Sequence, residues 1–140
     1  MRFMILVKAN ADSEAGTLPS TEELAEMGRY NEELVKAGVM LAGEGLHPSS
    51  RGARVKFSGS ERTVVDGPFA ETKELLAGFW LIQVKSREEA VEWVRRIPFR
   101  EGEVEIRQVA EAADFAPSDP TGELMAAEER LRAQVAARQA

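Results

Sequence analysis

The chain begins with a short apolar run, Arg2-Phe3-Met4-Ile5-Leu6-Val7-Lys8, in which five apolar residues stand between two charged ones. A second run of this kind, Phe79-Trp80-Leu81-Ile82-Gln83-Val84, lies much further along the chain. Neither run alternates between apolar and polar residues, as a strand with one face in water does. Both runs therefore predict strands that are buried on both faces, at the centre of a sheet.

Each apolar run is followed by a predicted helix. Ser20 precedes Glu23 by three residues, a spacing at which serine and glutamate form a capping box, and Ser86 begins the second helix in the same way. The first helix ends at Gly38, because glycine adopts the left-handed conformation that closes a helix. The second helix ends before Pro98, because proline cannot continue a helix.

The remaining segments complete a mixed pattern. Residues 10–19 are polar and predict a loop, whereas further strands are predicted at 39–46, at 103–107, and in a hairpin of 53–58 and 62–66 that turns at Gly59-Ser60. The order is strand, helix, strand, inserted hairpin, strand, helix, strand. This is the βαββαβ pattern of the ferredoxin-like fold, in the α+β class, with a hairpin inserted in its middle.

The sequence divides into a domain at residues 1–110 and a tail at 111–140. The tail contains a Pro- and Asp-containing linker, and Asp119-Pro120 is a good start for a helix. That helix offers only Leu124, Leu131 and Val135 as large apolar residues, which is too thin a stripe to cover a sheet. We expect a C-terminal amphipathic helix that acts as an additional arm.

Assembly is predicted from the two faces of the central strands. Met4 and Leu6 point away from Phe3 and Ile5, so both faces of the sheet are apolar. Two helices can cover only one of them. We therefore expect a homodimer in which two sheets pack face to face.

Composition excludes several classes of protein. The 140 residues include 18 basic and 24 acidic side chains, for a net charge of −6, with no cysteine and a single histidine, His47. Disulfides, thiolate metal sites and cysteine nucleophiles are excluded, and the acidic balance argues against nucleic-acid binding. No signal-peptide pattern or membrane-spanning run is present. We expect a soluble cytoplasmic domain and assign it no metal and no cofactor.

The most distinctive stretch is Asp66-Gly67-Pro68-Phe69-Ala70-Glu71-Thr72-Lys73-Glu74. It resembles the signature of DGPF-type proteins, a branch of the YCII-related domain family. Flanking residues agree with that family, namely Gly43-Glu44-Gly45-Leu46, Gly78-Phe79 and the closing segment 103–107. The resemblance spans roughly residues 1–110, and it implies a dimeric α+β barrel of two ferredoxin-like units packed through their sheets.

The resemblance also bears on function. Related members have been proposed to be enzymes that use a His–Asp pair in a cleft. Where that histidine would be expected, the first helix carries Met27, Arg29, Tyr30 and Asn31. DGPF-type proteins are often encoded beside extracytoplasmic-function sigma factors, which implies a regulatory role.

Two carboxylates are candidate catalytic residues. Asp66 is either a general base or ligand-binding group, or it caps the turn by accepting hydrogen bonds from the backbone of Phe69 or Ala70. Glu44 is a lone carboxylate in an apolar strand, so we expect it to be buried. It then pairs with Arg54 or Arg62 across the hairpin, or it serves as an acid or base.

Four further side chains are candidate ligand-binding groups: Arg54, His47, Lys73 and Glu74. Two functions follow from these candidates. The first is binding of a small polar or anionic ligand in the cleft of the dimer, with acid/base catalysis by Asp66 and Glu44 and with Lys73 or Arg54 holding the ligand. The alternative is a non-enzymatic interaction module whose acidic tail contacts a sigma factor.

Overall fold

The computed structural model describes residues 1–139, and of Lys73 it describes the backbone alone. The chain forms two compact units, Met1–Gln108 and a second unit that begins at Val109. The helices and strands of the first unit are β1 (Arg2–Lys8), α1 (Ala11–Glu14), α2 (Thr21–Lys36), β2 (Met40–Gly45), β3 (Ala53–Ser58), β4 (Glu61–Asp66), β5 (Leu76–Gln83), α3 (Arg87–Arg95) and β6 (Val104–Gln108). The second unit contains a 3-10 segment at Ala112–Ser118 and helix α4 (Glu123–Gln139).

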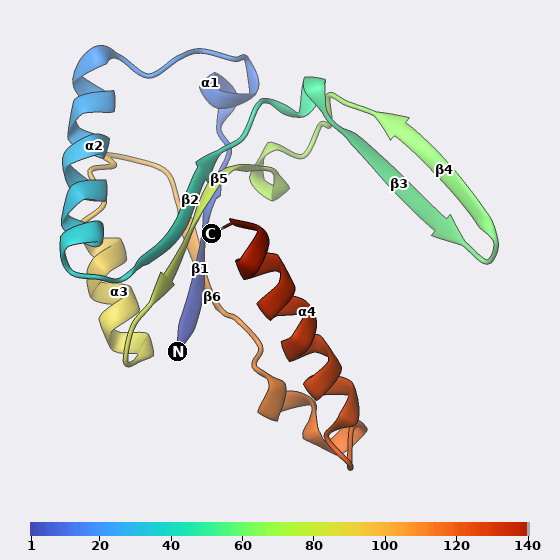
Figure 1. Ribbon diagram of the computed structural model, residues 1–140. Coiled ribbons are helices and arrows are strands. Elements are labelled where there is room, and N and C mark those ends of the chain that lie inside the picture. Colours follow the sequence, from blue (N-terminus) through green and yellow to red (C-terminus); the bar gives the residue numbers. More distant parts are fainter. Residues whose placement is uncertain (140) are drawn as a thin grey trace. The chain divides into compact units, whose positions relative to one another are not determined.

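The main sheet has four antiparallel strands in the order β2-β5-β1-β6. This is the strand order of a ferredoxin-like fold, and it places the two apolar runs, β1 and β5, at the centre. The predicted α+β class and the βαββαβ pattern are confirmed. Helices α2 and α3 lie together on one face of this sheet (Figure 1).

The helix starts follow from local hydrogen bonds. In α2, the Ser20 hydroxyl accepts from the Glu23 N–H at 3.1 Å and the Glu23 carboxylate accepts from the Ser20 N–H at 3.2 Å, so the predicted capping box is confirmed. In α3 the Ser86 hydroxyl caps the helix, but the Glu89 carboxylate accepts from Lys85 N–H instead. The second predicted box is therefore only half formed.

The loop predicted at residues 10–19 is partly wrong, because it contains the single helical turn α1. Asn10 Oδ1 accepts from the Ser13 N–H at 2.8 Å, and the Ser13 hydroxyl accepts from the Asn10 N–H at 2.9 Å. This reciprocal pair is a capping box built from asparagine and serine. It stabilises a turn too short to show an apolar stripe in the sequence.

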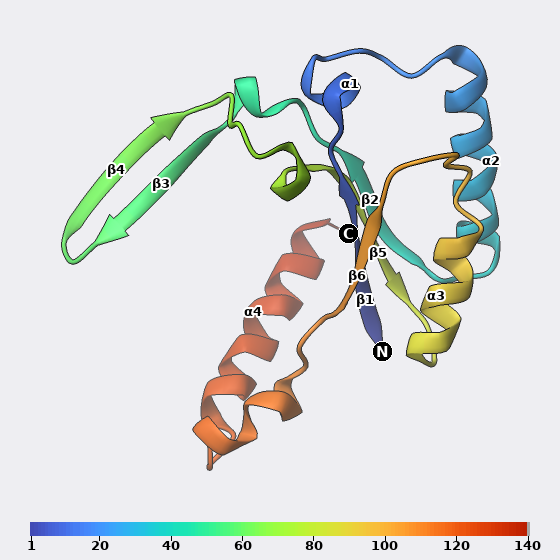
Figure 2. The same cartoon turned by 180° about the vertical axis from the view of Figure 1, so that it is seen from behind.

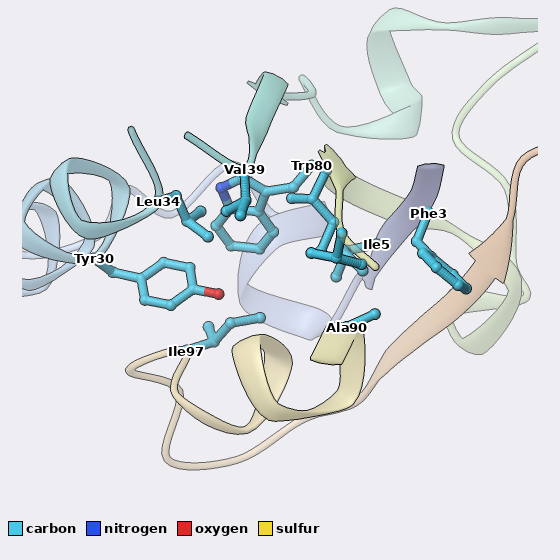
Figure 3. Close-up of a cluster of buried hydrophobic side chains, with 10 residues drawn as sticks. Phe3, Ile5, Tyr30, Leu34, Val39, Trp80, Ala90 and Ile97 are labelled. Atoms are coloured by element: carbon cyan, nitrogen blue, oxygen red, sulfur yellow. The ribbon is translucent and has the colours of Figure 1, made fainter. Parts of the chain in front are cut away.

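The hydrophobic core lies between the helices and one face of the sheet (Figure 3). Register pairs Ile5 with Trp80 and Phe3 with Ile82, so these four side chains share the face toward the helices. Each is at most 7% exposed, and α2 adds Leu34 at 1%. Burial of large side chains such as these contributes about 1.5–3 kcal/mol each.

The opposite face of the sheet, called the open face below, has an apolar centre. Met4, Leu6, Phe79 and Leu81 lie there and are half-buried. Within residues 1–108 both long helices lie on the other face (Figures 1 and 2). The first unit therefore leaves one face of its sheet without a helical layer, as the sequence predicted.

The edge strand β2 contains an irregularity. Met40 pairs with Ile82, but Ala42 pairs with Leu81, so Leu41 is an extra residue in the ladder. Its side chain is 48% exposed. An extra residue of this kind bends a strand and interrupts its pairing.

The hairpin of β3 and β4 forms a separate two-stranded sheet. Its limits and its turn at Gly59-Ser60 confirm the prediction, and Gly59 has the positive φ of +59° that such a turn requires. All of its strand residues are exposed, on both faces of the hairpin. The hairpin leaves the main sheet on the side away from α2 and α3 (Figures 1 and 2).

Gly67 joins the hairpin to the body of the first unit. Its N–H donates to Gly52 O at 3.0 Å. A Cβ at Gly67 would lie 1.8 Å from Ser49 O and 2.7 Å from the carbonyl carbon of Ser49, which are backbone atoms that cannot rotate away. Only glycine permits the two segments to approach this closely.

We predict that Gly67→Ala destabilises the protein, because the backbone at Ser49 must move to admit the methyl group. A loss of roughly 1–3 kcal/mol in the free energy of unfolding is expected from such overpacking. Gly45→Ala is the matched control, because no atom lies within 4 Å of its Cβ position. Urea denaturation measures both variants, and equal midpoints for the two would contradict the close approach.

Candidate functional site

The distinctive motif lies at the base of the hairpin, defined here as residues 47–54 and 66–69. The Phe69 N–H donates to the Ser49 hydroxyl at 3.0 Å. The guanidinium carbon of Arg54 lies 3.9 Å from the centre of the Phe69 ring, a cation–π contact. The motif therefore fixes the segment that leads into the hairpin, and it holds one arginine in place.

Ser49 is the centre of a further link. Its N–H donates to the Glu14 carboxylate at 2.9 Å, and its hydroxyl donates to the other oxygen of the same carboxylate. The Ser49 hydroxyl, followed by the Ser49 N–H, holds the pKa of Glu14 below its ordinary value. Neither residue was predicted from the sequence, since 35 positions separate them and neither stands in a recognisable motif.

Arg54 has unused hydrogen-bonding capacity. The side chain is exposed, and within residues 1–139 its guanidinium has no hydrogen-bond or ion-pair partner among the described side chains. A guanidinium presents its N–H donors in a planar fork that fits a carboxylate or a phosphate. The structure thus brings a predicted ligand-binding residue onto the motif, in a form that can receive an anion.

His47 lies at the same base and is exposed. The Arg51 Nη1 atom is 3.3 Å from both ring nitrogens of His47. Together with Arg54, Arg51 provides a second guanidinium at the hairpin base, beside the single histidine of the chain. The histidine is therefore on the surface, next to an arginine that the sequence analysis did not select.

Glu44 does not lie where the sequence analysis expected it. Register places it opposite Phe79, on the open face, and its side chain is exposed, so the predicted burial is wrong. The edge position of β2 explains the difference, because an edge strand reaches water. The predicted pairing with an arginine is also absent in the described part of the chain: Arg54 stacks on Phe69, and Arg62 donates to the backbone oxygens of Gly59 and Glu61.

Asp66 ends β4 opposite Ala53 and is exposed. The Phe69 N–H that it was predicted to cap donates to Ser49 instead, so that version of the turn-cap interpretation is wrong. Asp66 and Glu44 belong to two different sheets. Glu74 is exposed in a 3-10 turn at Thr72–Glu74, and the Lys73 side chain lies outside the described residues.

The helix position at which the resemblance implies a histidine is used for packing. The Tyr30 hydroxyl donates to Trp93 O at 2.7 Å, and Trp80 Nε1 donates to Asn31 Oδ1 at 2.9 Å. Burial raises the pKa of Tyr30 to about 12. Tyr30 therefore stays a neutral hydrogen-bond donor at physiological pH, and both side chains tie α2 to its neighbours.

A shallow hollow lies on the first unit away from the hairpin base. The hollow is lined by Val94, Arg95, Ile97, Phe99, Gly102, Glu103 and Val104. Over residues 1–139, no group of three or more histidine, aspartate or glutamate side chains could hold a metal ion. None of the described helices is long and apolar enough to cross a membrane.

We predict that the Glu14–Ser49 link makes stability depend on pH. Because the folded-state pKa of Glu14 is lowered, its contribution is present above the unfolded-state value near 4.5 and is lost as pH falls through the folded-state pKa. The melting temperature of the wild type should fall more steeply below about pH 4.5 than that of Glu14→Gln. In a Ser49→Ala background, the effect of the Glu14→Gln substitution on this slope should shrink; equal slopes in all four proteins would contradict the link.

Comparisons with known proteins identify the family of this chain. The YCII-related domain matches residues 1–113. An uncharacterized protein of Rhizobium meliloti strain 1021 is 38% identical over 72 residues, which cover 51% of this chain and 58% of that protein. Among solved structures, the chain is similar to 5-chloro-2-hydroxyhydroquinone dehydrochlorinase (TftG) from Burkholderia phenoliruptrix AC1100, in complex with 2,5-dihydroxybenzoquinone. The two structures superpose with a TM-score of 0.44 and 16% sequence identity, and the alignment covers 79% of this chain and 95% of that one. The family match spans the whole βαββαβ unit, and the chain belongs to the YCII-related domain family.

Proposed function

We propose that this chain binds a small anionic ligand, such as a carboxylate, at Arg54 beside the open face of the sheet. The observation that carries this proposal is the Arg54 side chain, which is held on the Phe69 ring while its N–H donors stay unused by described residues. An arginine that is already positioned loses less conformational freedom on binding than a mobile one. Arg51 adds a second positive charge at the same hairpin base, beside His47.

The second part of the proposal is a homodimer through the open faces. The open face of the first unit has no helical layer from that unit, and its centre is formed by Met4, Leu6, Phe79 and Leu81. An apolar face of this kind favours a second layer packed against it. The same face carries charged side chains at its edges, among them Glu44 and the ion pair of Lys8 with Glu105 at 3.5 Å. A cleft between two such faces would be apolar at its centre with a few polar groups, which is typical of small-molecule sites.

Catalysis stays a prediction within this proposal. Asp66 and Glu44 are the carboxylates that we propose as acid/base groups, and both are accessible to a ligand. The two carboxylates stand in different sheets. Asp66, which ends the strand that follows the hairpin turn, is the one within the hairpin base.

We predict that Arg54→Gln weakens binding of benzoate, used as a carboxylate probe, about tenfold or more, as expected from the loss of charge-assisted hydrogen bonds. Arg54→Lys should bind with intermediate affinity, because it keeps the charge and loses the fork. Titration monitored by ¹H–¹⁵N NMR gives the affinity, with the Phe69 amide as local reporter. The melting temperature of each variant checks that folding is intact.

Arg87→Gln is the matched control for this experiment, since Arg87 is an exposed arginine on α3, at the opposite face of the sheet. It should bind benzoate like the wild type. The proposal fails if the control and Arg54→Gln lose affinity equally, or if the wild type shows no shifts at the hairpin base.

Asp66→Asn tests the neighbouring carboxylate: altered binding of benzoate without an altered melting temperature favours a ligand-binding role for Asp66.

A second candidate function is an interaction module that contacts a sigma factor through the tail. The second unit is compact by itself, and its helix α4 exposes three large apolar side chains, Leu124 at 64%, Leu131 at 53% and Val135 at 55%. Their spacing follows the helical repeat, so they lie along one side of the helix. An exposed apolar stripe of this kind favours contact with another protein.

We predict that removal of residues 109–140 leaves the first unit folded, because that unit contains the whole four-stranded sheet and its core. If the tail is the docking element, the truncated protein should lose binding to a purified extracytoplasmic-function sigma factor from the same organism, measured by biolayer interferometry. Leu131→Glu should have the same effect, whereas Arg138→Glu should not. Retained binding after truncation would exclude the tail as the docking element.

A further inference from the structure

We propose that the β3–β4 hairpin is an arm that packs against a second copy of this chain. The inference rests on the sheet-to-sheet pairing of the proposed function and deepens it, because it assigns a role to a segment that the sheet and the core do not use. Three features of the hairpin carry it: an exposed apolar face, its direction from the sheet, and its charge.

The apolar face is formed by residues from both strands. Val55 pairs with Val64, and Phe57 stands two residues further along the same face. Val55, Val64 and Phe57 are 47%, 64% and 72% exposed, respectively. A lone two-stranded hairpin is marginally stable in water, and three large apolar side chains on one face of it favour a partner surface.

The direction of the hairpin indicates where that surface lies. The hairpin projects from the sheet on the side of the open face, away from α2 and α3 (Figures 1 and 2). Any layer that covers the open face therefore lies on the same side as the hairpin. When that layer is a second copy, each hairpin extends alongside the other subunit.

The charge of the hairpin favours a second copy of this chain as its partner. Residues 51–66 carry four basic side chains, Arg51, Arg54, Lys56 and Arg62, and two acidic ones, so the net charge of this segment is +2. The chain as a whole is −6, which leaves −8 for all other residues. A basic, partly apolar arm is thus complementary to the acidic body of another copy. That acidic body would repel a nucleic acid, which disfavours the other partner that a basic hairpin suggests.

The first test is the strength of self-association. Sedimentation equilibrium compares the wild type, the double variant Phe57→Ser/Val64→Thr and the control Leu18→Ser, which removes a side chain that is 85% exposed outside the hairpin. We expect the double variant to dimerise with a dissociation constant at least about tenfold weaker than that of the wild type. The control should dimerise like the wild type. Added salt should weaken dimerisation of the wild type more than dimerisation of the Lys56→Gln/Arg62→Gln variant.

The outcomes separate the arm from the dimer itself. If the wild type is dimeric and the double variant dimerises with the same dissociation constant, the proposed role of the hairpin is overturned, while the proposed sheet-to-sheet dimer is not. A wild type that stays monomeric at micromolar concentration would overturn both. Binding of a labelled DNA duplex by that monomer, lost in the Lys56→Gln/Arg62→Gln variant, would assign the arm to nucleic acid instead.

A second measurement shows the contact directly. Because the chain has no cysteine, Ser60→Cys in the hairpin turn can carry a single photo-crosslinker. Unlabelled Ser60→Cys protein is mixed with ¹⁵N-labelled wild type, so that mass spectrometry distinguishes crosslinks between copies from those within one copy. Crosslinks between copies are expected, and Arg87→Cys on α3 should give none. Crosslinks confined to one copy would overturn the proposal.

Discussion

One constraint governs the first unit: its sheet has central strands that are apolar on both faces, whereas the helices α2 and α3 of that unit both lie on one face. The pairing of β1 with β5 aligns Ile5 with Trp80 on the helical side and Leu6 with Phe79 on the other. The core, the exposed edge strand and the open face all follow from this arrangement. Hydrophobic burial is the largest favourable term in folding, so the face that the first unit leaves without a helical layer is where further association is favoured.

The distinctive motif acts at a boundary rather than in the core. Gly67 brings two backbone segments into contact, and Phe69 uses its N–H for Ser49 and its ring for Arg54. Ser49 in turn joins Glu14. Within the motif, Gly67 and Phe69 are thus constrained by local geometry, and the Arg54 guanidinium that Phe69 positions is still available at the surface.

The sequence predicted what depends on neighbours along the chain. The two long helices, the hairpin with its Gly59 turn and the α2 capping box all follow from patterns of a few residues. It failed where contacts join distant segments: the Glu14–Ser49 pair spans 35 positions, and nothing near either residue indicates it. Glu44 was misjudged for a related reason, since an apolar strand at the edge of a sheet has the same local pattern as one inside it, and only the strand order tells them apart.

The extra residue in β2 has a consequence for how such chains avoid uncontrolled aggregation. An unbroken edge strand offers a row of free N–H and C=O groups on which another strand can add, copy after copy. Leu41 interrupts that row in the first few residues of β2. Growth of a fibril by addition of strands to this edge is thereby discouraged.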